Sequence, residues 1–304
     1  MPDKAKTDAS GENADDNDVH PLWLEKADAL VEALPFMQRY EGEVVLIKYG
    51  GQVMSDEGLA ASCARDIALL RQSGVYPVVV HGGAPQIGTM LRELGIDTRF
   101  EDGLRVTDSK TIKVVEMVLA GSINKHIVNA ITQAGARAVG LCGKDGGLMV
   151  ARKLVHEGGV DLGFVGEPAR IDTEMVWSVL EAGLIPVIAP IAACDGGDTY
   201  NINADTAAGA IAVAMQARRL LLLTDVSGVL GEDGALVPAL NCTEARTMIE
   251  KQIITGGMIP KMQTSIRALE EGVEAVAILD GRQPHAVLLE LLTNHGAGTL
   301  ISAS

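Results

Sequence analysis

Two short glycine-rich segments have the composition of a phosphate-binding site. The apolar run from Val44 to Lys48 ends in Tyr49-Gly50-Gly51, and the run from Val75 to Val80 ends in His81-Gly82-Gly83. Glycine has no Cβ, so its backbone N–H can approach a phosphate oxygen, and the ammonium group of Lys48 attracts the same oxygens. One such segment would indicate only a tight turn beside a solvent-facing lysine. Two of them, after successive apolar runs, favour anion binding.

A second lysine and an acid occur in similar settings. Lys261 follows Gly256-Gly257-Met258-Ile259-Pro260, and because Pro260 suits the first turn of a helix, a plain helix start with a surface lysine is equally consistent. Asp205 ends the segment Asn201-Ile202-Asn203-Ala204-Asp205, just before an alanine-rich stretch. For this residue taken alone, a helix N-cap is the simpler interpretation.

Two further segments offer polar groups with more than one use. Arg105, in the segment from Phe100 to Asp108, is either a surface residue or a planar donor for a carboxylate ligand. The run from Leu221 to Val229 breaks into a polar turn, where Asp225 and Gly228 serve either the turn or a nucleotide.

Several familiar sites are excluded by spacing. Gly143-Lys144-Asp145 lacks the glycine and the Ser/Thr of a Walker motif, and no G-x-G-x-x-G follows a predicted strand. The histidines lack the spacing of a zinc site, and we predict no bound metal centre. The cysteines form no CxxC pair; they are Cys63, Cys142, Cys194 and Cys242.

Composition and charge restrict the class of protein. The 304 residues suffice for one large or two moderate domains, and with 47% hydrophobic but only 3% aromatic residues the core must be aliphatic. The 25 basic and 40 acidic residues give a net charge of -15, and no basic block interrupts them. This argues against nucleic acid or an anionic membrane as partner and favours small-molecule chemistry.

The N-terminal segment is acidic and then amphipathic. Residues 1–18 hold six acids against two lysines and hardly any large apolar side chain, so we predict a disordered tail. They resemble neither a secretory signal nor a transit peptide, and no long apolar segment follows, which favours the cytoplasm. From His20 to Tyr40 apolar residues recur at helical spacing until Pro35, which predicts a helix with a kink or stop there.

The rest of the chain alternates between apolar runs and helical patterns, which predicts a mostly parallel sheet covered on both faces. Ligands bind such sheets at the carboxyl ends of the strands, where the glycine segments lie. We predict strands at 44–48, 75–80, 136–141, 184–189, 220–224 and 275–279, helices at 56–73, 85–94, 109–133, 172–182, 205–217, 243–252 and 260–271, and a polar hairpin region up to 171.

Taken in chain order, these segments resemble the amino acid kinase family. The Arg105 segment, Asp161–Gly166 and Tyr200–Asp205 look like its acetylglutamate kinase branch, and the resemblance spans residues 20–304. It implies an open αβα sandwich with a mostly parallel central sheet, preceded by an extra N-terminal helix. Residues 42–195 would bind an acyl amino acid, and residues 196–304 would bind ATP.

The resemblance also implies a role for each segment in phosphorylating the side-chain carboxylate of N-acetyl-L-glutamate. Lys48 and Lys261 would stabilise the transferring phosphoryl group, and Asp205 would orient the two lysines. A carboxylate acceptor is already ionised at neutral pH, so it needs no general base, and the obstacle is repulsion between anions. Magnesium would arrive on the ATP phosphates. The implied substrate contacts are Gly82, Gly83, Arg105 and Asn201, and the implied ATP contacts are Gly50, Gly51, Thr224, Asp225, Gly228 and Met258.

Regulation and assembly follow from the same resemblance. The segment from His285 to Leu300 is similar to that of arginine-inhibited members, in which Glu290 would pair with a guanidinium and the Gly296 region would offer carbonyls. In such members a helix corresponding to residues 19–41 links dimers into a hexamer, a trimer of dimers. Some of them carry a histidine where this chain has Ala277. A helix packed on its own subunit is the alternative, and a signalling-protein partner stays undetermined.

Other relatives are the competing functions. Kinases of aspartate, glutamate, carbamate or UMP share the motifs, and an acetylglutamate synthase would need an acetyltransferase domain, whereas few residues follow Thr299. A catalytically silent arginine-sensing module would be expected to lack a lysine or Asp205, and all three are present.

Overall fold

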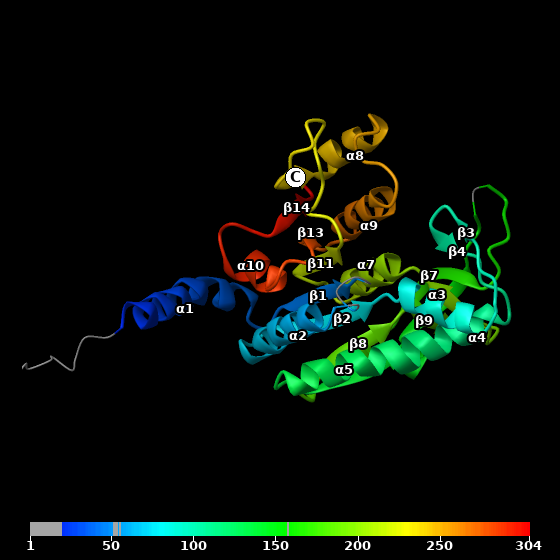
Figure 1. Ribbon diagram of the computed structural model, residues 1–304, viewed down its shortest axis with the longest axis horizontal. Helices are drawn as coiled ribbons and strands as arrows, with labels where there is room; N and C mark the ends of the chain where they lie inside the picture. The colour runs from blue at the N-terminus through cyan, green and yellow to red at the C-terminus, as the bar shows by residue number, and fades with distance from the viewer. Residues whose placement is uncertain (1–19, 51–53, 55, 157) are drawn as a thin grey trace, which may run out of the picture.

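One continuous sheet runs through the computed structural model, which describes residues 20–50, 54, 56–156 and 158–304. The predicted tail at 1–18 and Gly51 lie outside these residues. Eight strands form the sheet: β1 Val44–Tyr49, β2 Tyr76–His81, β5 Ala138–Cys142, β8 Ile185–Ala189, β11 Arg219–Thr224, β12 Ala239–Asn241, β13 Ala275–Asp280 and β14 Gly298–Ser302. Their order is β12-β14-β13-β11-β1-β2-β8-β5, and Figure 1 labels the strands from β14 through β1 to β8.

The sheet is parallel except where β14 runs antiparallel to β13. It confirms the predicted mostly parallel sheet and joins strands from before and after residue 195. In particular, β1 lies directly between β2 and β11. The division into an acyl amino acid half and an ATP half stays a prediction.

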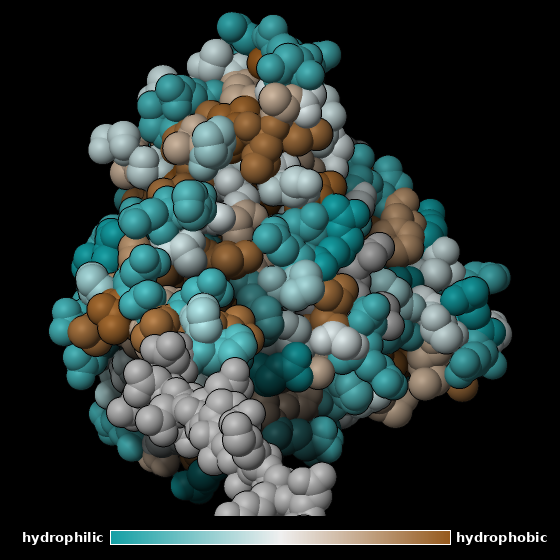
Figure 2. Space-filling view, turned by 60° about the vertical axis from the view of Figure 1, so that its left-hand side comes forward, coloured by the Kyte–Doolittle hydropathy of each residue, from teal (hydrophilic) through white to brown (hydrophobic). Residues whose placement is uncertain are grey.

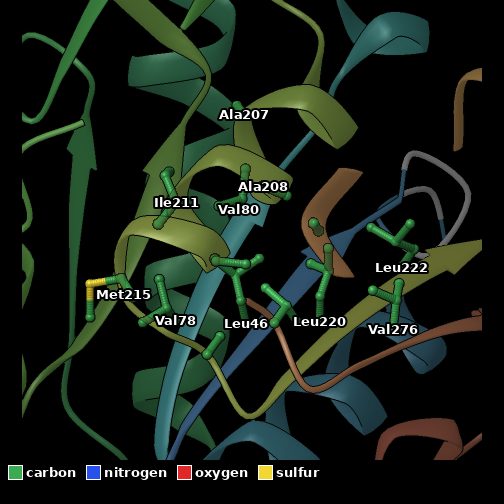
Figure 3. Close-up of a cluster of buried hydrophobic side chains, with 14 of the residues drawn as sticks. Leu46, Val78, Val80, Ala207, Ala208, Ile211, Met215, Leu220, Leu222 and Val276 are labelled. Carbon is green, nitrogen blue, oxygen red and sulfur yellow. The ribbon is translucent and has the colours of Figure 1, made fainter. Parts of the chain in front are cut away.

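Alternation along the strands builds a core on each face of the sheet. Val45, Ile47 and Tyr49 of β1 face one core, whereas Leu46 faces the other. The first core is covered by α2 Glu57–Gln72, α3 Ala84–Glu93, α4 Thr111–Glu116, α5 Asn124–Gln133 and α10 Ala286–Leu292. The second is covered by α6 Glu174–Glu181, α7 Ala204–Ala214, α8 Cys242–Glu250 and α9 Met258–Glu270. Figure 3 shows side chains of this second core, among them Leu46 of β1 and Ile211 of α7. These two helical layers confirm the predicted αβα sandwich.

The predicted helix at 109–133 contains a segment with a different helical geometry. Between α4 and α5 the segment η2, Met117–Ile123, is a π-helix. The predicted helical stretch is therefore confirmed from Thr111 to Gln133, but apolar periodicity did not reveal the π-helical turns within it. Such segments are frequent at functional sites.

The first helix is longer than the predicted stop allows. Helix α1 spans Pro21–Tyr40, which confirms the predicted N-terminal helix; it continues through Pro35, so of the two alternatives at that proline the stop is excluded. Apolar side chains of α1 are exposed, and Trp23, Leu30 and Val31 keep 65%, 67% and 69% of their accessible surface. Figure 2, in which this side of the molecule comes forward, shows apolar side chains at the surface beside hydrophilic ones. Among the described residues, no helix is both long and apolar enough to cross a bilayer.

A smaller sheet lies beyond the carboxyl ends of the strands of the main sheet. Its strands are β6 Met149–Lys153, β7 Val165–Ile171, β9 Ile191–Ala193 and β10 Thr199–Ile202, and they close into a ring through a single bridge between Val150 and Ala193. A separate hairpin joins β3 Phe100–Glu101 to β4 Leu104–Arg105. The sequence predicted only a polar hairpin here, and it did not predict β14, whose short apolar stretch is mixed with polar residues.

Candidate functional site

A carboxylate lying between two ammonium groups forms the centre of the site. Lys48 Nζ is 2.9 Å from Asp205 Oδ1, and Lys261 Nζ donates to Asp205 Oδ2 at 2.7 Å. The three residues come from β1, α7 and α9, which are far apart along the chain. The structure therefore brings together three residues that the sequence motifs singled out separately.

The strand and the helix that carry Lys48 and Asp205 determine where these two side chains point. Lys48 follows Leu46 by two positions in β1, so both side chains lie on the face that α7 and α9 cover. Asn203 is the N-cap of α7, since its side chain accepts from the N–H groups of Asp205 and Thr206 at 2.9 and 3.1 Å. The interpretation of Asp205 as the cap was therefore wrong. Asp205 lies in the first turn instead, where the helix dipole also favours a carboxylate.

Burial makes the charges of this cluster depend on one another. Lys48 and Asp205 keep only 8% and 7% of their accessible surface. Burial opposes ionisation of Asp205, but the charges of Lys48 and Lys261 outweigh it and lower the pKa of the carboxyl to about 2. Burial also lowers the pKa of Lys48, and the charge of Lys261 adds to that shift whereas Asp205 opposes it. Asp205 is therefore a fixed anion and has no proton to exchange at neutral pH.

A cavity of about 220 Å³ opens beside Lys48 and Asp205. Its wall includes all four residues predicted to bind the substrate, namely Gly82, Gly83, Arg105 and Asn201. The wall also contains apolar residues, namely Ile87, Phe100, Leu104, Leu119, Val165, Ile202 and prolines 85 and 190. The cavity thus suits a small ligand with anionic groups and an aliphatic portion.

Arg105 is a buried donor with a fixed position, which excludes its interpretation as a surface residue. Its guanidinium donates to Thr98 Oγ1 at 2.8 Å and to the carbonyl oxygen of Ala84 at 3.0 Å. It also lies 4.5 Å from the centre of the Phe100 ring. These contacts leave further N–H groups for a ligand in the cavity, because a guanidinium carries five.

The residues predicted to bind ATP are more dispersed. Gly50 follows β1, and a Cβ there would come within 2.6 Å of the Leu223 carbonyl oxygen, so β1 and β11 end side by side. Thr224 ends β11, and its hydroxyl donates to Asp225 Oδ1 at 3.2 Å. Among the described residues, those lining the cavity include none of this predicted set.

Two members of the predicted ATP set have local structural roles. Gly228 packs against β14, because a Cβ would lie 2.6 Å from Thr299 Oγ1, and Met258 begins α9.

The residues predicted to bind arginine are adjacent to each other. Glu290 Oε2 accepts from the N–H of Ala297 at 2.9 Å, and a Cβ on Gly296 would lie 3.1 Å from the same oxygen. Burial raises the pKa of Glu290, whereas the bond from Ala297 and the charge of Arg219 oppose the shift. A carboxylate partly removed from water can form a strong ion pair with a guanidinium.

Two polar residues next to the glycines of the cavity were not predicted from the sequence. His81 ends β2, and Asn124 begins α5; the His81 Nε2 and Asn124 Nδ2 atoms are 3.3 Å apart. Both side chains are fully buried. His81 stands directly before the two glycines and could have been considered, but Asn124 carries no motif that singles it out. In the part of the chain that the structure describes, no group of His, Cys, Asp and Glu has the arrangement of a metal site.

Comparisons with known proteins agree with the geometry. A model of the amino acid kinase family matches residues 43–280. The chain is 58% identical over 310 residues to an acetylglutamate kinase from Parvibaculum lavamentivorans, with 99% of each chain covered. It is 57% identical over 298 residues to an acetylglutamate kinase from Methylobacterium nodulans, covering 95% of this chain and 98% of that one.

Solved structures share the fold. N-acetylglutamate synthase from Neisseria gonorrhoeae, complexed with coenzyme A and N-acetyl-glutamate, superposes with a TM-score of 0.83 at 28% identity. The match covers 91% of this chain and 63% of the synthase, so this chain spans less than two thirds of that protein. Carbamate kinase from Giardia lamblia bound to AMP-PNP has a TM-score of 0.62 at 16% identity over 86% of this chain and 99% of that one, which shows the fold alone.

Replacing Asp205 tests the ion cluster through stability. An unfolded aspartate has a pKa of about 4, whereas the folded pKa is about 2. As the pH falls below 4 the unfolded chain takes up a proton that the folded chain does not, so the stabilisation present above pH 4 is lost toward pH 2. We expect Asp205→Asn to lower the free energy of unfolding at pH 7 by about 3 kcal/mol, because it leaves the buried Lys48 and the half-buried Lys261 without their carboxylate.

Urea unfolding at pH 7, 4 and 2.5 measures this effect. The difference between the original chain and Asp205→Asn should shrink as the pH falls. Asp56→Asn is the matched control, since an asparagine can still accept the bond from Leu59 N–H at the start of α2. A difference that is the same at all three pH values would contradict the ion cluster.

Proposed function

We propose that this chain, which belongs to the amino acid kinase family and within it to the acetylglutamate kinases, transfers the γ-phosphoryl group of ATP to the side-chain carboxylate of N-acetyl-L-glutamate. The product is N-acetyl-L-glutamyl 5-phosphate, an intermediate of arginine biosynthesis. The observation that carries the proposal is the meeting of Lys48 and Lys261 on Asp205 at the edge of a small-ligand cavity. A cytoplasmic location stays a prediction.

The cavity supplies groups for each part of the acyl amino acid. Arg105 and Asn201 would hold the α-carboxylate and the neighbouring amide, since both line the cavity and Arg105 has N–H groups left to donate. The apolar wall, including Leu119 and Val165, would contact the acetyl methyl group and the side-chain methylenes. In this proposed pose the side-chain carboxylate would lie toward Lys48.

The reaction needs positive charge more than it needs a base. The acceptor carboxylate is ionised at neutral pH, so nothing has to remove a proton from it. With both lysines protonated, the cluster of Lys48, Asp205 and Lys261 has one positive charge in excess. That charge would stabilise the phosphoryl group as it moves between two anionic oxygens. Asp205 keeps the two ammonium groups in position.

Magnesium would be held by the nucleotide. Both carboxylate oxygens of Asp205 face lysines, which does not suit a metal ligand. Bound magnesium would neutralise charge on the ATP phosphates. Gly50 and Thr224 remain the residues proposed to contact the ATP phosphates. They stand at the ends of β1 and β11, next to Lys48. Asp225, Gly228 and Met258 remain proposals for the rest of the nucleotide.

Lysine variants test the mechanism through turnover. We expect Lys48→Ala and Lys261→Ala each to lower kcat by about 10²-fold or more, because each removes a cation that stabilises the transferring group. Lys144→Ala is the matched control, since Lys144 pairs with Glu116 at the surface. The assay traps the acyl phosphate as a hydroxamate in the presence of ATP and magnesium.

The same assay separates the alternative kinases. N-acetyl-L-glutamate should be the preferred acceptor over L-glutamate, L-aspartate and carbamate. Near-normal turnover in both lysine variants would refute the mechanism, and a preference for another acceptor would refute the substrate assignment.

Arginine is the proposed feedback inhibitor, bound where Glu290 meets Gly296. Helix α10, which carries Glu290, packs against α1, so a ligand there could act on both elements. We expect arginine to lower the rate of the kinase reaction. The half-inhibiting concentration is the arginine concentration that halves a protein's own uninhibited rate. We expect Glu290→Gln to raise this concentration about tenfold, which corresponds to a loss of about 1.4 kcal/mol of binding free energy. Titration of arginine into the kinase assay measures this value.

An exposed glutamate provides the control for this titration. Glu232→Gln alters a carboxylate in the loop after β11 and should leave the half-inhibiting concentration unchanged. No effect of arginine up to millimolar concentration on the original chain would reject the inhibition. That outcome would fit the presence of Ala277 where some arginine-inhibited members carry a histidine.

The exposed apolar side chains of α1 support assembly through this helix. We propose that α1 pairs with α1 of a second copy and links dimers into a hexamer. Leu30→Asp with Val31→Asp, or removal of residues 1–40, should reduce the mass measured by light scattering to that of a dimer, because a charged face cannot be buried between helices. Glu32→Gln on the same helix is the control, and an unchanged mass in the aspartate variant would contradict the proposal.

A further inference from the structure

A buried imidazole lies directly behind the glycines that line the cavity. We propose that His81 is a positioning residue for phosphoryl transfer, which holds the carbonyl of Gly82 so that the N–H of Gly83 points into the cavity. This inference rests on the function proposed above, since that N–H would donate to the transferring phosphoryl group.

The contacts of His81 define which of its nitrogens carries the hydrogen. Its Nδ1 is 2.9 Å from the Gly82 carbonyl oxygen, and its Nε2 is 3.3 Å from Asn124 Nδ2. An amide nitrogen donates and does not accept, so Nε2 must accept. In a neutral imidazole the hydrogen is then on Nδ1, which donates it to the Gly82 carbonyl.

The orientation of the Asn124 amide is fixed by three further contacts. The two N–H groups of its Nδ2 are shared among His81 Nε2 and the carbonyl oxygens of Val187 at 2.8 Å and Leu141 at 3.3 Å, and its Oδ1 accepts from Lys125 Nζ at 3.1 Å. The reversed amide would place an oxygen against two carbonyl oxygens. The tautomer of His81 with the hydrogen on Nδ1 agrees with both contacts, since the Gly82 carbonyl oxygen can only accept and the Asn124 amide nitrogen can only donate.

The imidazole is neutral under ordinary conditions. It has no exposed surface, and burial lowers the pKa of His81 to about 4, with the Gly82 carbonyl opposing the shift and the charge of Lys125 adding to it. A neutral ring has one donor and one acceptor, which matches the two contacts.

The peptide bond between Gly82 and Gly83 links the position of the His81 ring to the direction of the Gly83 N–H. The peptide bond is planar and trans, so the carbonyl of Gly82 and the N–H of Gly83 point in opposite directions. No cis peptide bond occurs in the described part of the chain. Because the carbonyl faces the buried ring, the N–H of Gly83 points away from the ring, and Gly83 is one of the residues that line the cavity.

The π-helical segment η2 is close both to Gly83 and to Asn124, the partner of His81. A Cβ on Gly83 would lie 2.4 Å from Ile123 Cδ1 and 2.7 Å from Leu119 Cδ2, so η2 packs closely on that glycine. Asn124 follows η2 directly and contacts His81. The segment η2 thus packs against Gly83 and leads directly into Asn124, which contacts the imidazole of His81.

Two polar variants of the same residue separate positioning from stability. In His81→Asn the amide nitrogen can replace Nδ1 and donate to the Gly82 carbonyl, whereas in His81→Gln the longer amide reaches the Nε2 position and leaves that carbonyl without its donor. We expect His81→Asn to keep kcat within about threefold, and His81→Gln to lower kcat by about 10-fold to 100-fold, with KM for ATP and N-acetyl-L-glutamate within about twofold.

The controls make every outcome informative. Ile131→Ala, a core truncation in α5, should lower the unfolding temperature without this kcat loss. If His81→Gln does not fold, His81→Ala gives the same comparison, because it also lacks the donor. Equal kcat in the two variants, or kcat losses that follow unfolding temperature, would overturn the positioning role. Failure of the original chain to phosphorylate N-acetyl-L-glutamate would instead overturn the proposed function, and this inference with it.

Discussion

The structure depends on one electrostatic arrangement, in which two lysines share one buried carboxylate. Neither ammonium group could be kept in this partly buried place without Asp205, because an unpaired buried cation is costly. One carboxylate cannot neutralise both lysines, so the excess positive charge suits an anionic ligand. The acidic exterior, with a net charge of -15, does not oppose this, since a local cationic cleft can exist on a negative protein.

The fold is what allows the three groups to meet. Because β1 lies between β2 and β11, Lys48, the glycines after β2 and the end of β11 share one edge of the sheet. Side chains alternate along a strand, so a shift of one residue in β1 would turn Lys48 away from α7. The N-cap at Asn203 and the packing of α9 on α7 then bring Asp205 and Lys261 to the same place.

Sequence patterns predicted the features that depend on neighbours along the chain. Apolar periodicity gave the sheet and most helices, and the order of the glycine segments indicated Lys48, Asp205 and Lys261. The π-helix η2, the ring formed by β6, β7, β9 and β10, and the pairing of β14 depend on packing between distant segments. The contact of Asn124 with His81 joins residues 43 apart in sequence, and no local signal marks it.

The most direct test of the central claim is a crystal structure with magnesium, ADP, tetrafluoroaluminate and N-acetyl-L-glutamate. The fluoroaluminate ion imitates the phosphoryl group in transfer. We predict that it lies between the nucleotide and the substrate carboxylate, with Lys48 Nζ and Lys261 Nζ both at hydrogen-bonding distance of about 3 Å. A bound ion contacted by neither lysine, or a substrate outside the cavity beside Arg105, would contradict the account.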